Sequence, residues 1–177
     1  MNYQTLDIIA DSYIPLLALL SLYWLIILSG KRPGKHDEVG EPCVLAQKNL
    51  FRYRLLGLAI LLGTAYGLMF LDNLFHLWPS VGLDYSTHTA VALVLIIYLI
   101  LLKPEFKFLW GLSLIAYCGL MYYQRYHIVA DMVSTATTIM LILLLLAWLL
   151  FYAPPMCGDR RKLSEMFPAL KMWHRPE

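Results

Sequence analysis

Residues 82–103, GLDYSTHTAVALVLIIYLILLK, join a small polar cluster to a long apolar run. After Asp84 the chain carries no Asp, Glu, Lys or Arg until Lys103. A long apolar run of this kind suits a helix that lies in lipid. The stretch therefore predicts a membrane helix, with a histidine, His88, standing between two threonines at its start.

Similar apolar runs recur along the chain. Of its 177 residues 60% are hydrophobic, well above the roughly 45–50% of soluble domains. The mean hydropathy is +0.62. A helix needs about 20 mostly apolar residues to cross a bilayer, and the suitable runs are about 8–29, 53–72, 87–103, 107–123 and 128–152. We expect an all-α integral membrane protein, in which residues 1–153 form a bundle of about five transmembrane helices.

The basic residues predict how this bundle is oriented. Thirteen of the 14 Lys and Arg residues fall between the first and second runs, between the third and fourth, or after the fifth, and Arg125 is the exception. Short cytoplasmic loops are enriched in Lys and Arg. The N-terminus is therefore expected outside and the C-terminus in the cytoplasm, where residues 154–177 would form a basic amphipathic tail.

Other features limit the class of protein. The first residues carry Asp7 and Asp11 but no basic residue, unlike a cleavable signal peptide, so we expect the first helix to be retained. The three cysteines are widely spaced and indicate neither a disulfide framework nor a cysteine metal site. The net charge of +2 averages over two unlike surfaces. The basic surface suits anionic lipid headgroups, and we expect no nucleic-acid partner.

Ionisable residues gather near the helix ends on the predicted outer face. Such groups are costly at membrane depth and are candidates for function. They are Asp72, His76, Asp84, His88, Arg125, His127 and Asp131.

Several of these residues also have structural interpretations. Ser86 and Thr87 suit the N-cap of the third helix, where a hydroxyl accepts a free backbone amide. Asp84 can be a loop acid, and Asp72 an acid at a helix end, although a carboxylate there opposes the helix dipole.

The spacing of His127 and Asp131 favours a functional role. Residues four apart lie on one face of a helix, about one turn from each other. An aspartate in that position can fix the tautomer of an imidazole and stabilise its cation. After Asp131 no charged residue follows until Asp159, and an unpaired carboxylate there would be costly.

Two segments carry a resemblance to a known family. DYSTHTA (84–90) and RYHIVAD (125–131) resemble the second and third motifs of the type 2 phosphatidic acid phosphatase superfamily, nearest its sphingomyelin synthase-like branch. The match rests on Ser-x-His-Thr (86–89) preceded by an aspartate and an aromatic residue, and on the His-x3-Asp pattern. The matching residues are Asp84, Tyr85, Ser86, His88, Thr89, His127 and Asp131, and Asp72 loosely matches a further element of the branch.

This resemblance implies phosphoryl transfer through a phosphohistidine, without a metal or another cofactor. His127 would attack a lipid phosphate, Asp131 would orient it, and His88 would protonate the leaving alkoxide. Arg125 would bind the phosphate together with the start of the third helix, at Ser86 and Thr87. Asp72 and Asp84 are also expected among the substrate-binding residues of this site.

The sequence departs from the family in four places. Thr87 stands where the family has glycine, and the family's first motif has no counterpart on the predicted outer face. Met121 occupies the position of the third-motif arginine, with Arg125 as the nearest substitute. The family commonly has six spans, against the five expected here.

These observations predict an enzyme that hydrolyses a lipid phosphate at the outer face of a membrane, with membrane lipids around it. A bacterial inner membrane, with the site facing the periplasm, suits the compact loops. Three alternatives stay open. A lipid hydroxyl as acceptor would give a headgroup phosphotransferase, and His76, His88, His127 and Asp131 include possible zinc or iron ligands. The chain could also be a non-enzymatic membrane subunit or a transporter component.

Overall fold

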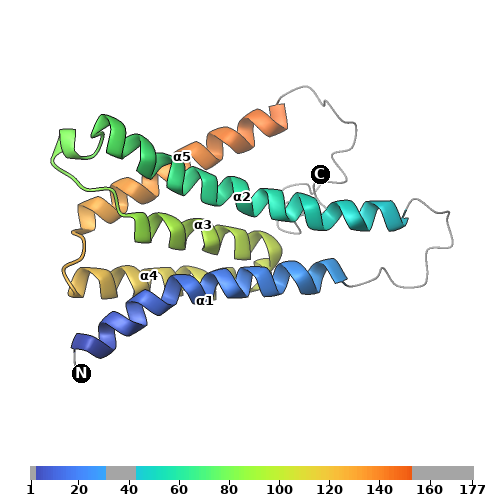
Figure 1. Ribbon diagram of the computed structural model, residues 1–177, viewed down its shortest axis with the longest axis horizontal. Coiled ribbons are helices and arrows are strands. Elements are labelled where there is room, and N and C mark those ends of the chain that lie inside the picture. Colours follow the sequence, from blue (N-terminus) through green and yellow to red (C-terminus); the bar gives the residue numbers. More distant parts are fainter. Residues whose placement is uncertain (1–2, 31–42, 153–177) are drawn as a thin grey trace, which may run out of the picture.

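The computed structural model describes residues 3–30 and 43–152, and this part of the chain is helical without a strand (Figure 1). The predicted tail, residues 154–177, lies outside the described residues. The helices are α1 (Tyr3–Gly30), α2 (Cys43–Phe75), α3 (Thr87–Leu102), α4 (Lys107–Tyr123) and α5 (Val129–Tyr152), with short 3₁₀ turns η1 (Pro79–Val81) and η2 (Pro104–Phe106).

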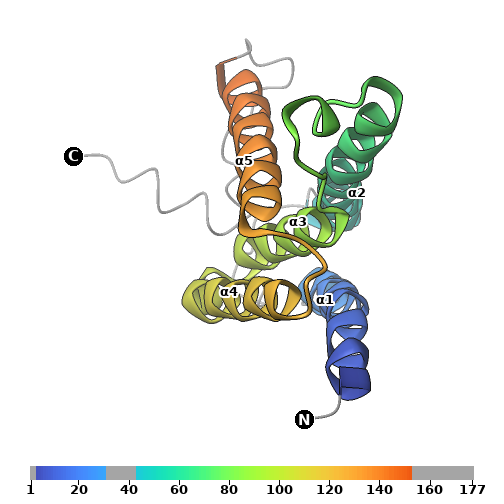
Figure 2. The same ribbon diagram turned by 90° about the vertical axis from the view of Figure 1, so that its left-hand side faces the viewer.

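Helix α3 forms the centre of the bundle, and the other four helices surround it (Figure 2). Eleven of its 16 residues are buried, among them Tyr98 and Leu99 with no exposed surface. The run from Ala90 to Leu102 contains only apolar residues and Tyr98, so it can face a neighbouring helix in every direction. The helix formed by residues 87–102 is therefore the core of the bundle.

Three helices are long and apolar enough to cross a membrane. The spanning segments are Thr5–Ser29, Phe51–Phe75 and Val129–Leu146. Their outward faces carry exposed apolar side chains, such as Ile8, Phe70 and Leu141, as expected for a surface in contact with lipid tails. These helices agree with an integral membrane protein.

The third and fourth predicted spans form helices at the predicted positions, but these are short. At 1.5 Å per residue, α3 with its 16 residues rises about 24 Å, less than the about 30 Å of a hydrocarbon core. Helix α4 has 17 residues. The five predicted segments are thus five helices, of which three have full spanning length.

Helix α2 differs most from the prediction, because it begins at Cys43, well before the apolar run that starts near Phe51. The residues in between include Leu45, Ala46, Gln47 and Lys48, all of which have high helix propensity. The polar residues before Phe51 mark the end of the predicted membrane span, but the helix continues through them.

The connections alternate between the two ends of the bundle. The start of α1, the α2–α3 loop (residues 76–86) and the α4–α5 turn (residues 124–128) lie at one end, and η2 lies at the other (Figure 1). The helices thus bring together the segments that were predicted to share the outer face. Which end faces the cytoplasm stays a prediction from the basic residues.

Candidate functional site

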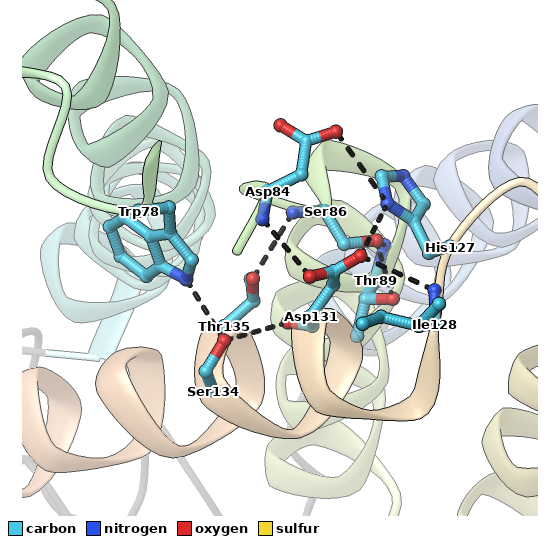
Figure 3. Close-up of polar contacts among 9 residues, drawn as sticks. All are labelled: Trp78, Asp84, Ser86, Thr89, His127, Ile128, Asp131, Ser134 and Thr135. Carbon is cyan, nitrogen blue, oxygen red and sulfur yellow. Dashed lines mark hydrogen bonds and ion pairs between the residues drawn. The ribbon is translucent and has the colours of Figure 1, made fainter. Parts of the chain in front are cut away.

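The first turns of α5 hold the α2–α3 loop by its backbone amides (Figure 3). The amide of Asp84 donates to Asp131 Oδ1 at 3.0 Å, and the amide of Ser86 donates to Thr135 Oγ1 at 3.1 Å. Asp131 and Thr135 are both buried, and they lie one turn apart on the same face of the helix. A polar stripe on an otherwise apolar helix therefore fixes the loop that precedes α3.

Trp78 anchors the other half of this loop. Its amide donates to Asp72 Oδ1 at 2.8 Å, and its Nε1 donates to Ser134 Oγ at 3.0 Å. Its ring packs edge-on against Tyr85, whose hydroxyl donates to the Ala65 carbonyl at 2.7 Å. Burial, and then the charge of Asp72, raise the pKa of Tyr85, so the hydroxyl stays protonated as this donor.

Asp131 has a structural role as well as a position beside His127. It is the third residue of α5, and its Oδ2 accepts the amide of Ile128, the residue before the helix, at 3.3 Å. An acidic side chain at this position commonly reaches back to the first free amide of a helix. With the contact to Asp84, the buried carboxylate accepts two backbone amides. Hydrogen bonding thus offsets the cost of its burial.

His127 lies in the α4–α5 turn and not on α5 itself, which begins at Val129. Its ring nevertheless reaches Asp131, as the spacing predicted, with Nδ1 at 3.7 Å from Asp131 Oδ2. The same nitrogen lies 3.9 Å from Asp84 Oδ2. Nδ1 is buried and makes no hydrogen bond to any described residue, while the opposite ring nitrogen points away from both carboxylates (Figure 3).

Arg125 ends helix α4 in the left-handed conformation, with φ of 61°. Its amide donates to the Tyr122 carbonyl at 3.0 Å, and the Tyr126 amide donates to the Met121 carbonyl at 3.1 Å. These two bonds form a Schellman motif, whose left-handed position usually holds glycine. An arginine here is uncommon, and the turn brings it next to His127.

An open pocket of about 280 Å³ lies where α4 ends and α5 begins. We call it the His127 pocket. Its lining consists of Tyr122, Arg125, Tyr126, His127, Ile128 and Asp131. The structure therefore brings together one cation, one imidazole and one carboxylate of the predicted site.

Asp84 stands at the rim of this arrangement. Its side chain is 73% exposed, and only its Oδ2 approaches His127. Asp72 is placed differently, because its carboxylate is buried, accepts the Trp78 amide and does not line the His127 pocket. Asp84 thus lies beside the imidazole of His127, whereas Asp72 stabilises the α2–α3 loop.

The start of α3 contributes less to the pocket than predicted. Ser86 is the N-cap, as expected, and its Oγ accepts from the Thr89 amide. It is fully buried, and its hydroxyl donates to Thr89 Oγ1 at 2.8 Å. Thr87 is the first residue of the helix and has a negative φ, so threonine fits where the family has glycine.

His88 does not meet His127 in the structure. Its side chain is exposed on the first turn of α3, and it makes no hydrogen bond or ion pair within residues 3–30 and 43–152. It does not line the His127 pocket. The predicted pairing of two histidines across one site is therefore absent from the contacts of the described chain.

Sequence reasoning missed the residues that support the site from a distance. Trp78, Ser134 and Thr135 hold the loop, and Asp7 of α1 contacts the α4–α5 turn. One signal was present: hydroxyl residues cluster in the first turns of α5, in the segment DMVSTATT (131–138). Hydroxyl side chains in an apolar helix often form hydrogen bonds to a neighbouring segment.

Within the part of the chain that the structure describes, no three His, Cys, Asp or Glu side chains are grouped so as to hold a metal ion. Comparison with protein families, with characterised proteins and with solved structures gave no match.

The two acids beside His127 should differ in their effect on stability. Asp131→Asn places an NH₂ group against one of the two backbone amides and should lower the free energy of unfolding by about 1–3 kcal/mol. Asp84→Asn, at an exposed side chain, should change it by less than about 0.5 kcal/mol. Thermal unfolding of both variants in detergent measures this difference, and equal stability of the two would contradict the structural role of Asp131.

Proposed function

We propose that this chain is a membrane lipid phosphate phosphatase, with its site in the His127 pocket. One observation carries the proposal. The imidazole of His127 has Nδ1 next to two carboxylates, its other nitrogen makes no hydrogen bond to any residue that the structure describes, and it shares an open pocket with Arg125. That arrangement suits a nucleophilic nitrogen beside a binding group for an anion.

In the proposed reaction, His127 forms a phosphohistidine beside the two carboxylates. Nε2 attacks the phosphorus, the bond from phosphorus to the lipid oxygen breaks, and the lipid leaves as an alkoxide that takes up a proton. Water then attacks the phosphohistidine, which releases inorganic phosphate and the free imidazole. Asp131 and Asp84, at 3.7 and 3.9 Å from Nδ1, offset the positive charge of the ring during both steps.

Arg125 supplies the positive charge that a phosphoryl group requires. Transfer of this group depends mainly on positioning and on charge at the non-bridging oxygens. Within residues 3–30 and 43–152, Arg125 is the cation at this end of the bundle, and the other Lys and Arg residues precede the middle of α2 or flank η2. His88, the proton donor that the resemblance implies, is exposed and does not line the pocket, so the alkoxide takes its proton from water in this proposal.

The position of the pocket suits a lipid substrate. It lies at the end of helices that are long and apolar enough to span a bilayer, so it would be at the level of the headgroups. Tyr122 and Tyr126, both partly exposed, line it, and tyrosines favour this interfacial zone. Water as acceptor gives a phosphatase, and a lipid hydroxyl gives a headgroup phosphotransferase. The basic residues favour a site outside the cytoplasm, and the compact loops suit a bacterial inner membrane with the site at its periplasmic face.

A second candidate is a non-enzymatic membrane subunit or transporter component. The hydrogen bonds of Asp131 favour it, because this carboxylate already holds two backbone amides. In that case the polar cluster would only connect the helices, and His127 would be dispensable for any chemistry.

An assay of lipid phosphates separates the two candidates. The purified protein should release phosphate from at least one member of a panel of lipid phosphates, in the presence of EDTA and with inhibition by vanadate. His127→Ala should lower the rate by at least about 100-fold, because it removes the nucleophile. The matched control is His76→Asn, at an exposed histidine of the same end, where asparagine also tolerates the left-handed backbone. Full activity in His127→Ala would refute the mechanism.

Two substitutions at Arg125 separate its charge from its backbone conformation. Arg125→Ala and Arg125→Gly both remove the guanidinium, but only glycine relieves the positive φ. If the charge binds phosphate, both should lose roughly 10- to 100-fold in kcat/KM, although Arg125→Gly should be the more stable protein. Steady-state kinetics and thermal unfolding test this, and an active Arg125→Gly would show that Arg125 only ends the helix.

A further inference from the structure

The first turns of α1 reach the site through a single carboxylate. Asp7 Oδ1 accepts a hydrogen bond from Gln124 Nε2 at 2.7 Å and lies 3.4 Å from the hydroxyl of Tyr126. These contacts join positions more than one hundred residues apart in the chain. They link the start of the first helix to the turn that carries His127.

The two contacts lie on either side of Arg125. Gln124 is the C-cap of α4, and Tyr126 is the residue that completes the Schellman motif and also lines the His127 pocket. Asp7 therefore binds the residue before and the residue after the left-handed Arg125. Both ends of this strained position are tied to the same carboxylate of α1.

The chemistry of these contacts makes them specific. The Gln124 side chain is partly buried, and its Oε1 makes no hydrogen bond to any described residue. An amide in that situation is oriented by the one strong bond that it makes, the charge-assisted bond from Nε2 to Asp7. The Asp7 charge also raises the pKa of Tyr126, which keeps the phenol protonated as a donor.

We propose that Asp7 is a positioning residue of the His127 pocket, which holds Gln124 and Tyr126 so that Arg125 and His127 face the same space. Its effect on catalysis rests on the proposed function. Its effect on the geometry of the turn does not. Asp7 would not touch the substrate, and α1 would be part of the site through this carboxylate alone.

The test compares Asp7→Ala with Asp11→Ala in the full chain. Asp11 lies one turn further along α1, carries the same charge and is exposed, and it makes no hydrogen bond to the α4–α5 turn within the described residues. The first readout is the rate at which diethyl pyrocarbonate modifies His127, resolved from the other histidines by mass spectrometry. Asp7→Ala should raise this rate severalfold, and Asp11→Ala should leave it at the wild-type value.

The second readout is kinetic. With a lipid phosphate as substrate, Asp7→Ala should lower kcat/KM by about tenfold, the equivalent of one charge-assisted hydrogen bond. Asp7→Asn, which keeps an acceptor oxygen for Gln124, should recover part of this loss. Asp11→Ala should retain wild-type kinetics.

A double variant guards against general damage to the fold. Gln124→Ala should reproduce the effect of Asp7→Ala on His127 modification, and the two substitutions together should have no larger effect than either alone. Unchanged modification of His127 in both single variants would overturn the proposal. If the wild type releases phosphate from none of the lipids, the proposed function fails, and the modification rates still decide the role of Asp7.

Discussion

The arrangement of the polar end of this bundle depends on the hydrogen bonds that the buried carboxylate of Asp131 accepts. It accepts the amide of Asp84 from the α2–α3 loop and the amide of Ile128 from the turn before α5. One side chain thereby fixes the start of α5, the approach to α3 and the surroundings of His127. A carboxylate at this depth is stable only with such partners. The hydrogen bonds of Asp131 therefore stabilise the fold and also shape the candidate site.

Polar contacts at this end take the place of extensive packing along α5. Helix α5 packs mainly against the central α3 and stands apart from α2 and α4 (Figure 2). Its far flank carries exposed leucines, such as Leu141 and Leu144, which suit lipid contact. The hydrogen bonds that the α2–α3 loop donates to Asp131, Ser134 and Thr135 therefore hold α5 in place at this end.

Sequence reasoning predicted those features that arise within one segment. The apolar run at 87–103 predicted a helix there, Ser86 was expected as its N-cap, and the spacing of His127 and Asp131 indicated that they would meet. Each depends on local geometry, namely on an apolar run, on the free amides at a helix start, or on a short separation along the chain, since His127 lies in the turn before α5. The length of α2 was underestimated because polar helix formers continue a helix beyond the apolar segment.

Features that depend on distant segments were not predictable in this way. Nothing in the neighbourhood of Asp7 indicates a contact with Gln124, because the packing of α1 on α4 creates it. His88 was expected opposite His127 because both lie near helix starts on one face, yet the direction of its side chain follows from the rotation of α3 within the bundle. Arg125 was recognised as a charge, while its left-handed backbone depends on how α4 ends.

Amide hydrogen exchange at Asp84 tests the central role of Asp131 most directly. In wild-type protein in detergent, this amide should exchange much more slowly than a free loop amide, although it lies outside every helix. In Asp131→Asn that protection should be largely lost, while the Ser86 amide, held by Thr135, should keep more of its own. Exchange of the Asp84 amide at the rate of a free loop in the wild type would contradict the account.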